Sequence, residues 1–87
     1  MANHKSAAKR ARQTETRTAR NRLIKTRTRT AVKNFREALA RNDEKAKELL
    51  DRATRALNKA ASKGVIHKRN AARSVSRLVQ SFKKRSA

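Results

Sequence analysis

The chain lacks cysteine, proline, tryptophan and tyrosine, and it has one glycine among 87 residues. So few turn-forming residues argue against a β-sandwich or a βαβ unit and favour helices throughout. The absence of cysteine excludes disulfides and thiolate metal sites. Residues 2–22 contain no large apolar side chain, so a signal peptide is not expected, and no later apolar run has the length of a membrane span. We therefore expect a cytoplasmic, all-α protein without a membrane segment.

Acidic residues are also scarce. Six Asp and Glu oppose 26 Lys and Arg, which gives a formal charge of +20. Such a charge repels itself and exceeds what solubility requires for a small domain. The usual physical reason to keep it is a polyanion whose counterions are released on binding, and nucleic acid is the commonest such polyanion. The charge therefore predicts a nucleic-acid-binding protein.

Large apolar side chains are few as well. Alanine supplies 16 of the hydrophobic residues, and the rest are four Val, six Leu, two Ile, two Phe and the initiator Met. Alanine buries little apolar surface, so this set provides a thin core for 87 residues. We expect the free protein to be marginally stable and its partner to supply part of the order.

Three segments repeat apolar residues at helical spacing: residues 23–40, 44–63 and 68–84. As helices they have similar lengths, about 25–30 Å each. Short links make successive helices antiparallel neighbours. The predicted fold is a single domain, residues 1–87, in which these segments form an antiparallel three-helix bundle and residues 1–22 extend beyond it.

The two links between these segments contain residues that are typical of helix ends. Asn42 tolerates the left-handed conformation that ends a helix, and Asp43 is a good N-cap for the next one. Glu44 would then lie in the first turn, where its charge suits the helix dipole. Gly64 stands where a terminal residue with positive φ is expected.

Residues 1–22 form a basic extension that has no apolar face. Its alanine and arginine content is compatible with helix, but no core constrains it, so a disordered basic tail in the free protein stays an alternative. The stretch "KTRTRT", residues 25–30, alternates like a strand. We interpret it as helix, because Ile24, Val32 and Phe35 set a helical phase around it. That phase puts Arg27 and Arg29 on opposite sides of the helix.

The charge is unevenly distributed. Residues 1–36 carry +11, residues 37–62 carry +1, and residues 63–87 carry +8. The middle helix therefore supports a binding surface that the first and third helices form. Ion pairs are expected on the middle helix, at Glu44/Lys47, Glu48/Arg52 and Asp51/Arg55. On the third helix a basic row is formed by Arg69, Arg73, Arg77 and Lys84.

The chain offers no aromatic platform for reading bases, since Phe35 and Phe82 both belong to apolar stripes. Contacts are therefore expected to go to phosphates and riboses, with selectivity from the shape of a folded RNA or the deformability of DNA. A DNA-compaction protein and a cationic helix lying on an anionic membrane are the alternatives. Two lone histidines do not assemble a metal site, and the acids stand at salt-bridging spacings, so neither cofactor nor catalysis is expected.

Two stretches, "ANHKSAAKRARQ" near the start and "KGVIHKRNAARSVSRL" at residues 63–78, resemble the bacterial small-subunit ribosomal protein S20 family, and the resemblance covers essentially the whole chain. The first stretch matches the family pattern at Asn3, Lys5, Ser6, Lys9 and Arg10. The second matches at Lys63, Gly64, Ile66, His67, Lys68, Ala71, Ala72, Arg73, Ser76, Arg77 and Leu78. The second match is the more specific.

The resemblance implies a long first helix in a three-helix bundle that binds 16S ribosomal RNA of the small subunit as a monomer, joins RNA elements distant in sequence, and takes no small-molecule substrate. His67 could donate to a phosphate or merely cap the third helix. With the charge distribution, the resemblance predicts RNA contacts at Asn3, Lys5, Ser6, Lys9, Arg10, Arg17, Arg20, Arg22, Lys25, Arg29, Lys33, Arg36, His67, Lys68, Arg69, Arg73 and Arg77.

Overall fold

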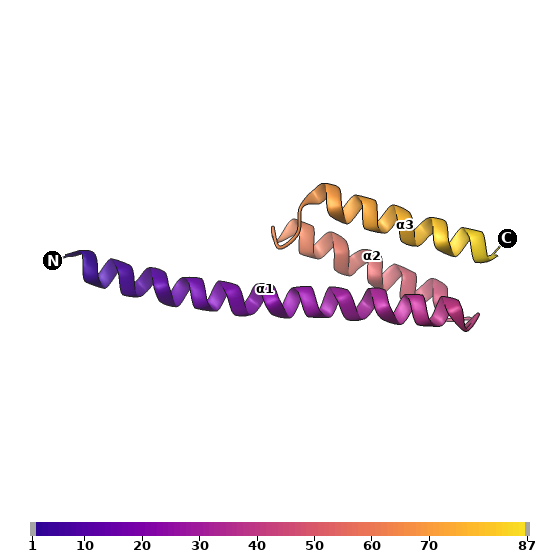
Figure 1. The fold of residues 1–87 in the computed structure, drawn as a ribbon, viewed down its shortest axis with the longest axis horizontal. Coiled ribbons are helices and arrows are strands. Elements are labelled where there is room, and N and C mark those ends of the chain that lie inside the picture. Colours follow the sequence, from indigo (N-terminus) through magenta and orange to yellow (C-terminus); the bar gives the residue numbers. More distant parts are fainter. Residues whose placement is uncertain (1, 87) are drawn as a thin grey trace.

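The computed structural model describes the backbone of residues 2–86 and the side chains of residues 6–85. It contains three helices, α1 (Ala2–Ala40), α2 (Ala46–Ser62) and α3 (Lys68–Ser86), and no strand within the described backbone. Figure 1 shows that α2 and α3 lie beside the C-terminal half of α1, whose N-terminal half extends well beyond them. The predicted all-α fold with a long first helix is confirmed.

Helix α1 is continuous over its 39 residues. It includes "KTRTRT", so the helical interpretation of that stretch is confirmed. Thr28, which has 8% exposure, donates its hydroxyl to the Ile24 carbonyl at 2.8 Å, so its buried oxygen has a partner. All residues from 6 to 20 are exposed, because no other element reaches them.

The end of α1 follows the expected local chemistry. Asn42 has φ 56°, the left-handed conformation predicted for it. Its N–H donates to the Leu39 carbonyl (3.2 Å), and the Asp43 N–H donates to the Ala38 carbonyl (2.9 Å). These two bonds form a Schellman motif, which satisfies carbonyls that the end of the helix would otherwise leave without partners.

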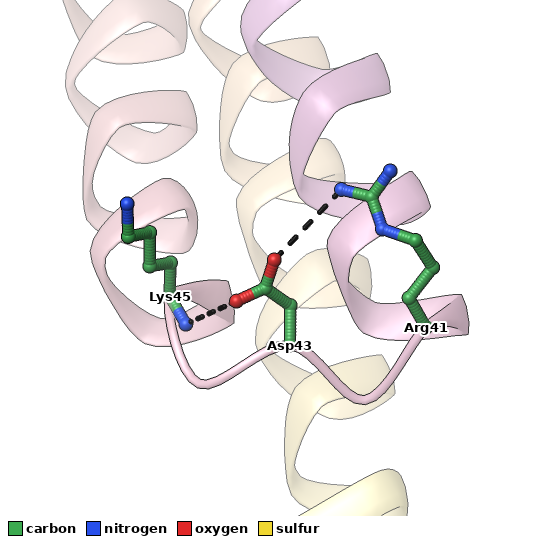
Figure 2. Close-up of polar contacts among 3 residues, drawn as sticks. All are labelled: Arg41, Asp43 and Lys45. Carbon is green, nitrogen blue, oxygen red and sulfur yellow. Dashed lines mark hydrogen bonds and ion pairs between the residues drawn. The ribbon is translucent and has the colours of Figure 1, made fainter.

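The predicted N-cap of α2 is wrong. The helix begins at Ala46, so Glu44 precedes it, and the cap position is held by Lys45 without a side-chain hydrogen bond. Asp43 instead closes the turn (Figure 2): its Oδ1 accepts the backbone N–H of Lys45 at 3.0 Å, and its Oδ2 lies 3.9 Å from Arg41 Nη2. An Asp that bonds the backbone two residues on favours a turn over an immediate helix start.

The α2–α3 link repeats the first motif. Gly64 has φ 75°; its N–H donates to the Ala61 carbonyl, and the Val65 N–H donates to the Ala60 carbonyl. The predicted positive φ of the only glycine is confirmed. An added Cβ would meet nothing within 4 Å, so the glycine is required by its backbone conformation and not by space.

Gly64→Ala is therefore expected to lower the free energy of unfolding by about 1 kcal/mol, the cost of a left-handed non-glycine residue. Thermal unfolding followed by far-UV circular dichroism would measure it. The control is Lys63→Ala, since Lys63 is exposed with ordinary helical φ. Equal melting temperatures for the two variants would contradict the conformational explanation.

Helix α2 lies between the other two and supplies the centre of the core. It packs along both α1 and α3, whereas α1 and α3 make few contacts with each other. Its side chains Leu50, Ala53 and Leu57 are buried among Phe35 of α1 and, from α3, Ala71 and Leu78. The supporting position predicted for the charge-balanced helix thus has a structural basis.

Only one of the three ion pairs predicted for the α2 segment forms. Arg52 Nη2 lies 3.1 Å from Glu48 Oε1. Glu44 and Lys47 do not pair, because Glu44 stands before the helix and not on its surface. The Asp51–Arg55 pair also stays open within the described side chains, as solvated pairs of this spacing commonly do.

Candidate nucleic-acid interface

The N-terminal half of α1, residues 2–22, forms an arm that presents basic side chains to solvent. Ser6, Lys9, Arg10, Arg17 and Arg20, all predicted contacts, are exposed on it. The backbone at positions 3 and 5 is helical, but the side chains of the two predicted contacts there, Asn3 and Lys5, lie outside the described ones. The arm is a helix with charge around its circumference, so anions can approach it from several directions.

Closer to the bundle, the basic residues of α1 form a row along one side. They recur every three or four residues, the spacing of one helix face, at Arg22, Lys25, Arg29, Lys33 and Arg36. The last four line a groove of about 850 Å³ between α1 and α3. Lys33 Nζ also lies 4.0 Å from Glu37 Oε1, a solvent-exposed contact that leaves the ammonium accessible.

The opposite side of α1 is basic too. Arg27 lines a separate hollow of about 320 Å³ between α1 and α2, together with Thr30, Leu49 and Arg52. Arg29 lines the groove on the α3 side, so the predicted placement of the two arginines on opposite sides is confirmed. Sequence reasoning left Arg27 and Arg52 out of the candidate contacts, although the two-sided spacing already indicated a second basic surface.

Basic residues of α1 and α3 also meet in a second, smaller hollow. Arg36 of α1 and Arg77 of α3, distant in sequence, line one hollow of about 180 Å³ with Arg85. Arg85 was not among the candidates, although its distance of eight residues from Arg77 places both on one helix face. Arg69 and Arg73 are exposed on α3 but do not line these hollows.

Of the two roles predicted for His67, a helix cap and a phosphate contact, the structure shows the cap. Its Nδ1 accepts the backbone N–H of Arg69 at 3.1 Å, so the side chain caps the helix. With Nδ1 as acceptor, the neutral ring carries its proton on Nε2, which stays a donor on an exposed side chain. A phosphate contact by His67 therefore remains a prediction, compatible with the cap. Lys68 beside it is exposed.

The arrangement of exposed basic side chains is suited to neutralising phosphates. Within the part of the chain that the structure describes, no three His, Asp or Glu side chains gather where they could hold a metal ion. None of the helices there is both long and apolar enough to cross a membrane.

Comparison with known proteins identifies the family of this chain. Residues 2–83 match the family Ribosomal protein S20. The small ribosomal subunit protein bS20 of Geotalea daltonii is 57% identical over 92% of this chain and 93% of its own length. Its counterpart in Helicobacter hepaticus is 55% identical over 97% and 94%, and that in Symbiobacterium thermophilum is 53% identical over 100% and 90%. A match of this extent, on a long basic helix followed by a short helical pair, shows that the chain belongs to the ribosomal protein S20 family.

Proposed function

We propose that this protein is a structural constituent of the small ribosomal subunit that binds 16S rRNA directly, through phosphates and riboses, and stabilises its folded structure during assembly. Its family is one of ribosomal structural proteins and not of enzymes. The observation that carries the proposal is that Arg36 of α1 lines one hollow with Arg77 and Arg85 of α3, while α2 between the two helices is nearly neutral.

The arm and the bundle would contribute differently. The arm extends as a free helix with basic residues around it, so it can lie between RNA segments and contact phosphates on more than one side. The bundle presents fixed rows: Lys25, Arg29, Lys33 and Arg36 on α1, and Lys68, Arg69, Arg73 and Arg77 on α3. Together they would join RNA elements that are distant in sequence.

Recognition would depend on RNA shape and not on base identity. Phe35 has no exposed surface and Phe82 is half-buried against the core, so neither can serve as a stacking platform. Specificity must then come from the spacing of phosphates in the folded RNA. We place the protein in the cytoplasm, within the ribosome. We expect a single copy there, because a charge of +20 opposes self-association.

The test is binding to 16S rRNA across a salt series, with equal masses of tRNA and duplex DNA as competitors. We expect the preference for 16S rRNA to persist as salt rises, since shape-specific contacts add to counterion release. Equal affinity for all three, lost together with increasing salt, would contradict the proposal and favour a non-specific, DNA-compacting polycation.

Replacing one arginine, Arg73, should measurably change the salt dependence of 16S rRNA binding. Arg73→Ala is expected to weaken 16S rRNA binding modestly and to reduce the slope of log K against log salt by about one. Arg55→Ala, on the exposed surface of the charge-balanced α2, is the control and should leave the slope nearly unchanged. If Arg73→Ala also leaves the slope unchanged, Arg73 is not a phosphate contact.

A further inference from the structure

The groove between α1 and α3 has a floor that phosphate contacts do not explain. Because both helices are antiparallel to α2, they run in the same direction on either side of it (Figure 1). The floor is apolar: it is lined by the buried Leu57 of α2 and the half-buried Val32 and Ile66. Apolar side chains are stabilised by apolar partners, whereas a ribose–phosphate chain offers mainly polar surface.

The dimensions of the groove suit a helix. Its α1 wall extends from Lys25 to Ala40, about 22 Å or four turns of helix. Its α3 wall carries the short side chains Asn70 and Ser74, which permit close approach. Two parallel helices supported by a third leave the position that the fourth helix occupies in a four-helix bundle.

The charge of the rim defines the occupant further. Lys25, Arg29, Lys33 and Arg36 all line the groove, and Glu37 is the one acidic residue beside them. A helix that lies here must therefore carry acidic residues flanking its apolar stripe. A second copy of this chain does not meet that requirement, because each of its three helices carries more basic than acidic residues.

We propose that this groove binds an acidic amphipathic helix of another protein, which packs its apolar stripe on Val32, Leu57 and Ile66 and pairs its carboxylates with the basic rim. This is the helix-in-groove mode of recognition. The same rim belongs to the RNA surface proposed above, so the helix and 16S rRNA exclude each other; only this exclusion rests on the proposed function. Such a partner would shield the surface until the protein joins RNA.

The first probe is a labelled synthetic helix of about 18 residues with leucines along one face and glutamates elsewhere. Its control is a scrambled isomer of the same composition, in which the leucines share no face. Fluorescence anisotropy with the full-length protein at about 0.15 M salt is expected to give at least tenfold tighter binding for the amphipathic peptide. Equal affinity for both, or binding of neither, would overturn the proposal.

Matched charge reversals locate the binding site. Arg29→Glu and Arg27→Glu make the same change two residues apart, on the groove side and on the opposite side of α1. Arg29→Glu and Asn70→Glu should each lower the affinity for the amphipathic peptide about tenfold. Arg27→Glu should lower it much less. Because all three side chains are exposed, the fold should persist, which circular dichroism can verify. Equal losses for the two arginine variants would show that only net charge matters and overturn the proposal.

Competition separates this inference from the proposed function. Unlabelled 16S rRNA is expected to displace the bound peptide. If rRNA binds with its expected preference but the peptides do not bind, the groove proposal alone fails. If the amphipathic peptide binds as predicted but rRNA shows no preference over tRNA, the proposed function fails and the groove remains. If rRNA binds without displacing the peptide, their mutual exclusion is refuted.

Discussion

Phe35→Ala is expected to lower the free energy of unfolding by about 3–5 kcal/mol and the melting temperature by about 15–30 °C. Phe35 is fully buried, the largest side chain in the core to be so. It belongs to α1 but packs in one cluster with Leu50 and Leu57 of α2 and Leu78 of α3. Its truncation leaves a cavity where all three helices meet, and a core built largely of alanine has few large side chains to fill it.

Far-UV circular dichroism of the free protein would measure the change. Leu23→Ala is the matched control on the same helix, since Leu23 is 49% exposed and should cost less than about 1 kcal/mol. Adding 16S rRNA should raise the melting temperature of Phe35→Ala, because a partner that binds only the folded state stabilises it by mass action. If Phe35→Ala and Leu23→Ala lowered the free energy of unfolding by similar amounts, the three helices would not share one cooperative core.

Local signals in the sequence are what made the helices and their ends predictable. The apolar spacing around Leu50 and Leu57 places α2 correctly, and Asn42 and Gly64 adopt the left-handed conformations that their chemistry favours. Asp43 misled the prediction because the same side chain can cap a helix or close a turn. The choice between the two depends on the next few backbone bonds, which the residue type does not specify.

The basic residues of the candidate site were predictable one by one, but their grouping was not. Lys25, Arg29, Lys33 and Arg36 were predicted as single contacts, and the structure places all four along one groove. The convergence of Arg36 with Arg77 and Arg85 depends on how α3 is rotated and placed against α1 through α2, which no local pattern encodes. The apolar groove has the same origin, since it exists only because α1 and α3 lie apart on the two sides of α2.

Deleting residues 2–22 is expected to separate stability from RNA binding. Residues 6–20 are exposed and touch no part of the core, so the melting temperature should change little. The deletion removes seven Lys and Arg and one acid. If about four of the seven contact phosphates, the salt slope should fall by about three and the affinity for 16S rRNA roughly a thousandfold at 0.1 M salt.

A full-length variant with those seven basic residues replaced by glutamine separates charge from length. Glutamine keeps helix propensity similar, so the arm can remain helical while losing its charge. If the arm acts by neutralising phosphates, this variant should lose about as much affinity and salt slope as the deletion does. A variant that keeps most of its affinity would mean that the arm acts through its shape. An unchanged slope in the deletion itself would mean that the arm does not contact phosphates, and that the rows on the bundle bind RNA alone.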